Sequence, residues 1–333
     1  MDLDAFVAEH QGEWDRLRRL AGKRKRRMSA EEVDELVALY HRTATHLSIV
    51  RSRSPDPAVV AWLSRLVLQA RAALTPSSGF TGAGLARFLL VSFPGEVVRA
   101  SGWWGGVLLI SVLLIGIRMA VVADDPTGYM STGQIDDLVN HSFEAYYSSF
   151  QPQNFAMLVW TNNTFIAALC LATGVLILPV LLILYSNIEN IGMVGGVMVG
   201  SGRGDIFFGL VLIHGLLELT AVFIAAGVGL RIGWAWIAPG SHRTRAQALA
   251  ERARSAMVVA LGLAIVLLIS GLIEAFVTPL PVPIPIKLAF GALVWLGFLG
   301  YLGSFGTVAV LSRQSADVDP LDRPAEAPTL PAG

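Results

Sequence analysis

The chain has 333 residues, of which 54% are hydrophobic and only 15% are charged. Soluble domains carry about a quarter charged residues, so this composition excludes an ordinary soluble globular protein. The 25 basic and 25 acidic side chains cancel, and the distribution of charge along the chain is more informative than its sum. A single cysteine, Cys170, excludes an internal disulfide and a multi-cysteine metal cluster.

Residues 1–95 are polar and charged, show no cleavable signal peptide, and are predicted to form a cytosolic helical region. Residues 29–32 have the spacing of a helix-capping box, and the apolar residues that follow recur with helical period. Asp56 followed by Pro57 is typical of the start of another helix. We therefore expect a helical hairpin, followed by an interfacial helix near residues 85–91.

The dense basic run 23–27 has two interpretations. It can attract anionic lipid headgroups, at about 1 kcal/mol per basic residue near the surface, or it can be a solvated loop that helps to retain the segment in the cytosol. No nucleic-acid-binding module accompanies the run, so nucleic acid is not an expected partner.

Five long stretches are apolar enough to cross a bilayer, which takes about 20 helical residues. They are 103–122, 164–185, 206–230, 257–277 and 286–311. One further stretch, 188–200, is short, glycine-rich and almost uncharged. Segment 123–160 is acidic with no lysine or arginine, whereas the N-terminal region and segment 231–256 are basic. The positive-inside rule puts both basic segments in the cytosol, which requires 188–200 to cross as well.

The predicted fold class is therefore all-α: a polytopic helical membrane protein with about six passages, one of them short and glycine-rich. Its membrane domain covers residues 96–312, both termini are in the cytosol, and the lipid bilayer is its first partner. Five passages, or a re-entrant hairpin, are the alternatives. Residues 313–333 are rich in proline and poor in large apolar side chains, and are predicted to be disordered.

Gly192, Gly196 and Gly200 recur every four residues, a spacing that lets two membrane helices approach closely. We expect this stripe to serve packing within one subunit; contact between two copies in a homo-oligomer is the alternative.

Ionisable groups at membrane depth cost from about 3 to over 10 kcal/mol when unpaired, so they face a partner or a water-filled cavity. His214 and Glu218 are four residues apart and share one helical face, and Glu274 lies in the next span. They are interpreted either as internal polar contacts that hold the bundle together, or as a polar pathway or partner-binding groove. The asparagines expected to cap or bridge helices around them are Asn162, Asn163 and Asn187.

No complete catalytic, metal or cofactor motif is present, so the sequence predicts a non-enzymatic protein without a cofactor. The glycine-rich segment 200–205 lacks the strand and the Lys-Ser/Thr ending of a phosphate-binding loop, and is predicted to be a turn. Ser304 paired with His214 would make an intramembrane serine hydrolase, which is the third hypothesis for the function.

The motif His214-Gly215-x-x-Glu218 lies within an apolar helix and is accompanied by Asn162-Asn163 and by Gly229-Leu230-Arg231-x-Gly233. On this pattern, residues 162–233 resemble the stage II sporulation protein M family of integral membrane proteins, and the resemblance extends over about residues 35–312. The resemblance implies a multi-pass protein of the plasma membrane with no known cofactor. It also implies a role like that of the sporulation member, a membrane anchor for peptidoglycan-degrading proteins during engulfment.

The leading hypothesis is thus a membrane scaffold that recruits cell-envelope remodelling partners. Its contacts would be the cytosolic hairpin and the acidic outer loop, with Tyr146, Tyr147 and Phe150 as aromatic anchors. The alternative, from a different class, is a permease or channel component with His214, Glu218 and Glu274 along a polar path.

Overall fold

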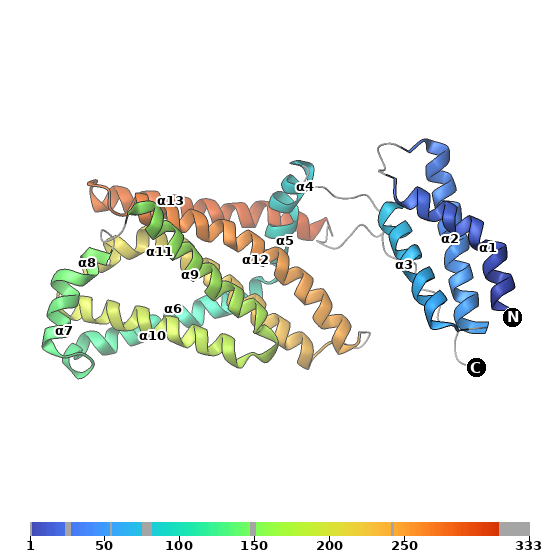
Figure 1. Cartoon of the computed structure of the whole chain (residues 1–333). Coiled ribbons are helices and arrows are strands. Elements are labelled where there is room, and N and C mark those ends of the chain that lie inside the picture. Colours follow the sequence, from blue (N-terminus) through green and yellow to red (C-terminus); the bar gives the residue numbers. More distant parts are fainter. Residues whose placement is uncertain are drawn as a thin grey trace. The chain divides into compact units, whose positions relative to one another are not determined.

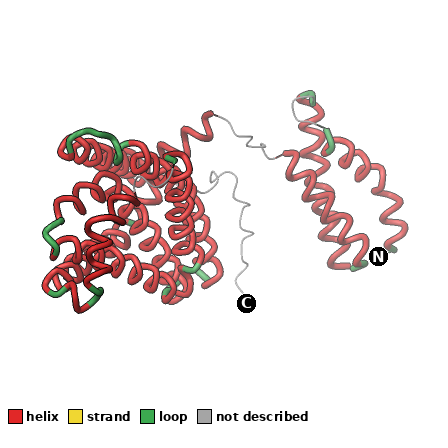
Figure 2. The backbone as a smooth tube through the Cα atoms, turned by 60° about the vertical axis from the view of Figure 1, so that its left-hand side comes forward, coloured by secondary structure: helices red, strands yellow, loops and turns green. Residues whose placement is uncertain are grey.

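The computed structural model describes residues 2–23, 28–53, 55–74, 82–146, 151–240 and 243–312, and within these ranges the regular elements are all helices (Figures 1 and 2). The chain divides into two compact units, Met1–Gly84 and Leu85–Gly333. Arg24 to Arg27 of the basic run and the tail 313–333 lie outside the described residues, as do Tyr147 and Phe150.

The first unit contains three helices with their own apolar core: α1 (Leu3–Ala21), α2 (Ala30–Arg53) and α3 (Pro57–Leu74). The predicted capping box is present, because the Ser29 hydroxyl accepts from the Glu32 amide at 3.2 Å and the Glu32 carboxylate accepts from the Ser29 amide at 3.4 Å. The predicted hairpin corresponds to α2 and α3, and α1 adds a third helix. Trp14, Leu17 and Leu20 are buried at helical spacing on α1, a pattern that the hairpin prediction did not use.

Six helices among the described residues are long and apolar enough to cross a membrane, which confirms the predicted all-α, six-passage class. They belong to the second unit, and Figure 1 shows their order along the chain. The first five are α6 (Ser101–Asp124), α9 (Pro152–Ala172), α10 (Leu178–Gly200), α11 (Gly204–Ile237) and α12 (Arg245–Phe276). The last is α13 (Ile284–Tyr301), continued by η6 (Leu302–Gly306) and α14 (Thr307–Leu311).

The boundaries predicted for the second and third passages are wrong. The expected span 164–185 contains the turn η5 (Gly174–Leu176), which separates α9 from α10, and the expected short helix 188–200 is the second half of the 23-residue α10. The turn is itself apolar, so hydropathy alone shows no break there. Its local sequence signals are Gly174 and Pro179, and in the structure Ile177 between them has a positive φ of 60°. The number of passages, and hence the parity argument, is unchanged.

The glycine stripe of α10 lies against α6 of the same chain. A Cβ atom on Gly196 would lie 2.5 Å from Val122 Cβ and 2.8 Å from the Met119 carbonyl oxygen. A Cβ on Gly200 would lie 2.6 Å from the Ala123 carbonyl oxygen. Gly192 and Gly196 are buried in this packing, as expected for contact within one subunit, whereas Gly200 at the end of the helix is exposed.

The segment before the first passage contains α4 (Gly82–Arg87), η2 (Phe88–Ser92) and α5 (Phe93–Arg99). The expected interfacial helix is therefore packed into the membrane unit rather than joined to the first one. Phe93 is 2% exposed and fills the space beside Gly262 of α12, while the Tyr301 hydroxyl donates to the Leu89 carbonyl.

Helix α11 is the central helix of the membrane unit and contacts α6, α9, α10, α12 and α13. Its second half docks the η5 turn, because Gly233 leaves room for the Gly174 carbonyl, to which a Cβ would come within 2.6 Å. The segment between α6 and α9 is also helical in part, with η3 (Pro126–Gly128), α7 (Thr132–Asp137), η4 (Leu138–Ser142) and α8 (Phe143–Tyr146).

Candidate functional site

Polar and ionisable side chains from three membrane helices meet beside the middle of α11. His214 and Glu218 project from one face of α11, Glu274 comes from α12, and Asn163 comes from α9. His214 and Glu274 are only 5% and 4% exposed. Groups of this kind are costly among apolar helices unless they find partners.

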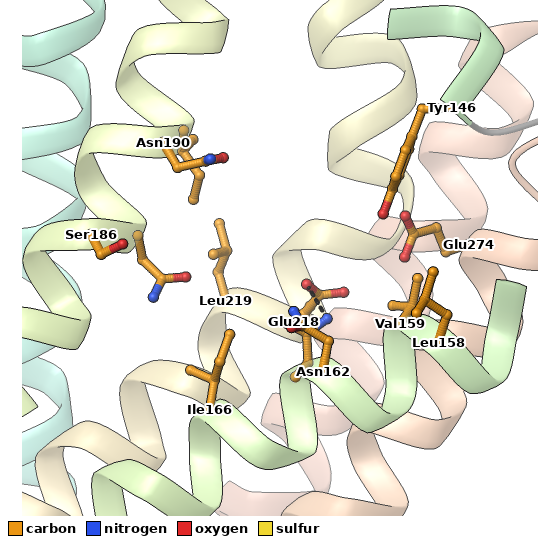
Figure 3. A pocket seen from close by; sticks show the side chains of 13 residues that line it. Tyr146, Leu158, Val159, Asn162, Ile166, Ser186, Asn190, Glu218, Leu219 and Glu274 are labelled. Carbon is orange, nitrogen blue, oxygen red and sulfur yellow. Dashed lines mark hydrogen bonds between the residues drawn. The ribbon is translucent and has the colours of Figure 1, made fainter. Parts of the chain in front are cut away.

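The contacts within this group, here called the His–Glu cluster (His214, Glu218 and Glu274), are close. His214 Nε2 lies 3.6 Å from Glu274 Oε1. Asn163 Nδ2 donates to Glu218 Oε1 at 2.8 Å (Figure 3, dashed line). One ligand-capable atom from each cluster residue lies within 4.8 Å of the other two. The structure thus brings together the three ionisable residues singled out from the sequence, and it places Glu274 directly beside His214.

Ser270, which the sequence interpretation did not single out, fixes the level of α12 against α11. Its hydroxyl donates to the His214 carbonyl at 3.1 Å, and it is fully buried. Ser270 and Glu274 are one turn apart on α12, so this bond sets Glu274 at the height of His214. The only sequence signal for this contact is a small polar residue one turn before an intramembrane glutamate.

A cavity of about 570 Å³ adjoins the His–Glu cluster and runs between α9, α10 and α11 (Figure 3). A second cavity, of about 420 Å³, reaches His214 from the side of η4 and α8. Glu218 and Asn190 line both. The polar residues that line the larger cavity, besides Glu218 and Glu274, are Tyr146, Asn162, Asn163, Ser186, Asn187 and Asn190.

Tyr146 has a position different from that expected of an outer-loop anchor. In Figure 3 its ring extends toward Glu274, and its ring centroid is 5.2 Å from that of Phe155. Burial, and then the nearby Glu274 and Glu218 carboxyls, raise the pKa of the Tyr146 phenol. The residue therefore lies at the edge of the cavity, next to the cluster.

The remaining asparagines differ in what they contact. Asn162 lines the cavity, whereas Asn187 also donates to the Ile183 carbonyl of its own helix at 2.9 Å. Asn163 is the one that bridges two helices, through Glu218.

The hypothesis of a Ser304–His214 dyad is wrong. On the last passage, Gly291 packs against Ile213, next to His214. Ser304 follows 13 residues later, which is about 20 Å further along a helix. It is exposed on η6, far from the imidazole.

A second group with metal-ligand chemistry lies in the first unit, where ligand atoms of His10, Glu13 and His46 are within 4.8 Å of one another. These groups are already engaged. His46 Nδ1 accepts from Trp14 Nε1 at 3.2 Å, the His10 and His46 rings stack at 4.0 Å, and Glu13 Oε1 pairs with Arg42 at 2.8 Å.

A family model described as Stage II sporulation protein M matches residues 103–279, a range that holds the whole His–Glu cluster. A domain of unknown function (DUF8413) matches residues 4–76, which are the three helices of the first unit. No curated protein and no solved structure matches the chain significantly.

Proposed function

Because the chain belongs to the stage II sporulation protein M family, we propose that this integral membrane protein is a non-enzymatic scaffold. It holds cell-envelope remodelling partners, among them peptidoglycan-degrading proteins, at the plasma membrane. The chain folds as two compact units, and the six helices long and apolar enough to cross a membrane all belong to the second, which supports such a scaffold.

One observation supports a scaffold over a permease or channel: the polar cavity ends against an apolar core. Beyond Thr220, every residue of α11 from 221 to 229 is buried and apolar. A continuous path for solute needs polar groups or water across the whole thickness. The arrangement suits the binding of a polar group that enters from one side and stays.

We further propose that the N-terminal unit lies in the cytosol. In a six-passage arrangement, the segment between α6 and α9 lies on one side of the membrane. The segment between α11 and α12 and the N-terminal unit lie on the other side. The former carries Asp125, Asp136 and Asp137 without any lysine or arginine up to α9, while the latter and its flanks carry Arg243 and Arg245. The positive-inside rule favours the cytosol for the basic side. The scaffold would then offer a partner surface on each side of the membrane.

Site-specific photo-crosslinking in the native membrane tests the scaffold role. A photoreactive residue at exposed Asp136 probes the outer side, one at exposed Thr45 of α2 probes the first unit, and one at Leu293 of α13, which is 70% exposed, serves as the lipid-facing control. The proposal expects a peptidoglycan-degrading protein, or a protein that regulates one, as an adduct at position 136 or 45 and not at 293. Lipid adducts alone at all three positions, or adducts only with proteins unrelated to the envelope, would contradict it. An adduct of twice the chain mass would identify a homo-oligomer.

The second candidate is a permease, which the size and polarity of the cavity favour. In reconstituted vesicles, a permease would show solute flux that Glu218→Gln abolishes while the fold survives. The scaffold proposal expects no such flux from the unchanged chain.

A further inference from the structure

We propose that His214, Glu218 and Glu274 bind a divalent first-row transition-metal ion, of which Zn²⁺ is the best fit. Nothing in the scaffold role requires this site, so the two proposals stand or fall separately. The metal would lie at the deep end of the polar cavity, between α11 and α12.

The first support is the spacing of the ligand atoms. Two ligands on a tetrahedral zinc ion with bonds of about 2.1 Å are about 3.4 Å apart. His214 Nε2 and Glu274 Oε1 are separated by 3.6 Å, and the Glu218 carboxylate completes a triangle with no side longer than 4.8 Å. Small side-chain rotations would bring all three onto one ion.

The second support is charge. Two carboxylates share the cluster, and among the described residues neither is paired with a lysine or an arginine. The buried Lys287 is already hydrogen-bonded elsewhere, because its Nζ donates to the Thr278 and Leu280 carbonyls at 2.8 and 3.1 Å. Two carboxylates among apolar helices are strongly unfavourable without a counter-charge. One divalent cation supplies it.

The third support is the orientation of Glu218. Asn163 donates to Oε1, while Oε2 is buried and has no hydrogen-bond partner in the described part of the chain. The Ser270 hydroxyl, which lies close to Glu218, donates to the His214 carbonyl. Metal-binding carboxylates are typically held in this way, with one oxygen fixed by an outer hydrogen bond and the other free for the ion.

The choice of metal follows from the ligand types. One imidazole nitrogen with two carboxylate oxygens suits zinc, manganese or iron better than magnesium or calcium, which prefer oxygen alone. Three protein ligands leave one tetrahedral position, and the adjoining cavity gives water access to it.

The test measures metal bound to the full-length protein in detergent. His10→Gln and His46→Gln are introduced first, so that the histidine group of the first unit cannot contribute. After chelator treatment, the protein is equilibrated with Zn²⁺ and desalted, and bound zinc is measured by mass spectrometry. We expect about one ion per chain, and at least about a tenfold loss of affinity in Glu218→Gln, Glu274→Gln and His214→Gln. Glu251→Gln makes the same chemical change at an exposed carboxylate and should leave binding unchanged.

Two further measurements keep the test decisive if a cluster variant fails to fold. Co²⁺ added to the unchanged cluster should give the visible absorption of a tetrahedral site, which needs no substitution. Asn163→Ala keeps all three ligands and should weaken zinc binding by about 10- to 100-fold. Absence of zinc binding and of the cobalt spectrum would overturn the proposal, as would zinc binding that the cluster substitutions do not change. Partner crosslinks at position 136 or 45 would be unaffected by that result.

Discussion

Arg118 of α6 and Glu189 of α10 form an ion pair between two membrane-crossing helices, with Nε 2.9 Å from Oε2. Their side chains are 21% and 31% exposed, and the guanidinium also lies over the Tyr129 ring at 4.5 Å. Gly192 of α10 leaves the space that the Arg118 stem fills, since a Cβ there would lie 2.6 Å from Arg118 Cγ. The ion pair and the glycine stripe thus act together to join α6 and α10.

Removal of one partner should destabilise the protein, because the other charge is left in an apolar setting. Breaking a buried pair costs about 3–5 kcal/mol, and partial exposure makes the lower end the expected value. Arg118→Met and Glu189→Met should each lower the midpoint of thermal unfolding in detergent, followed by tryptophan fluorescence. The double substitution should cost clearly less than the sum of the two.

The exposed pair Arg243–Glu251 provides the control for this prediction, because its side chains are 43% and 40% exposed. The same substitutions there should cost about 1 kcal/mol or less. If Arg118→Met and Glu189→Met proved additive, the two side chains would not be coupled as the structure shows.

The packing of the glycine stripe predicts that two Gly→Ala substitutions have different effects on the stability of the protein. At Gly196 the new methyl would meet Val122 and the Met119 carbonyl, so overpacking should cost about 1–3 kcal/mol. At Gly297 of α13, a Cβ meets nothing within 4 Å, and alanine favours the helix by up to about 1 kcal/mol. Thermal unfolding should therefore show a loss for Gly196→Ala and none for Gly297→Ala. Equal midpoints would mean that α6 and α10 do not pack through this stripe.

The first unit should lose stability on mild acidification. Burial, and next the neighbouring His10, lower the pKa of His46 in the folded state, while the unfolded value is about 6.5. Between these two values the unfolded chain binds more protons. The contribution of His46 is therefore complete above about pH 6.5 and is lost as the pH falls toward the folded-state pKa. Protonation of Nδ1 would also remove the acceptor for Trp14.

Hydrogen exchange of α1 and α2 in the full chain measures this effect locally. After correction for intrinsic rates, the free energy of opening should be lower at about pH 5.5 than at about pH 7. His46→Gln should remove this difference, whereas His41→Gln, at an exposed position on α2, should retain it. A pH response that persists in His46→Gln would contradict the assignment.

The six passages could be predicted from apolar length and loop charge, because both are local properties of the sequence. The division between α9 and α10 could not, since Val175 and Leu176 of the turn are as apolar as the helices that they join. A turn with apolar side chains is stable there because its backbone docks onto Gly229 and Gly233 of α11, residues more than 50 positions away. That contact is tertiary and has no signature in a hydropathy profile.

The contacts of the candidate site also divide into those that the sequence predicts and those that depend on tertiary packing. His214 and Glu218 could be paired from their spacing on one helix. The addition of Glu274 needs the register of α12 against α11, which the Ser270 bond fixes, and the role of Asn163 needs the packing of α9. The sequence does not pair Arg118 with Glu189, because the predicted helix 188–200 begins later than α10 (Leu178–Gly200) and places Glu189 at its end instead of within a span.

Cysteine labelling tests the sidedness on which the scaffold proposal depends. Cys170 is buried in α9, so replacing it with alanine gives a background without a reactive thiol. In intact cells, a membrane-impermeant maleimide should label Asp136→Cys, while Thr45→Cys and Arg245→Cys should react only after the membrane is opened. Five passages with a cytosolic N-terminus would expose Arg245→Cys to the outside, and an inverted chain would expose Thr45→Cys. The six-passage arrangement puts positions 45 and 245 together on the side opposite to 136, because three helices, α9, α10 and α11, separate 136 from 245.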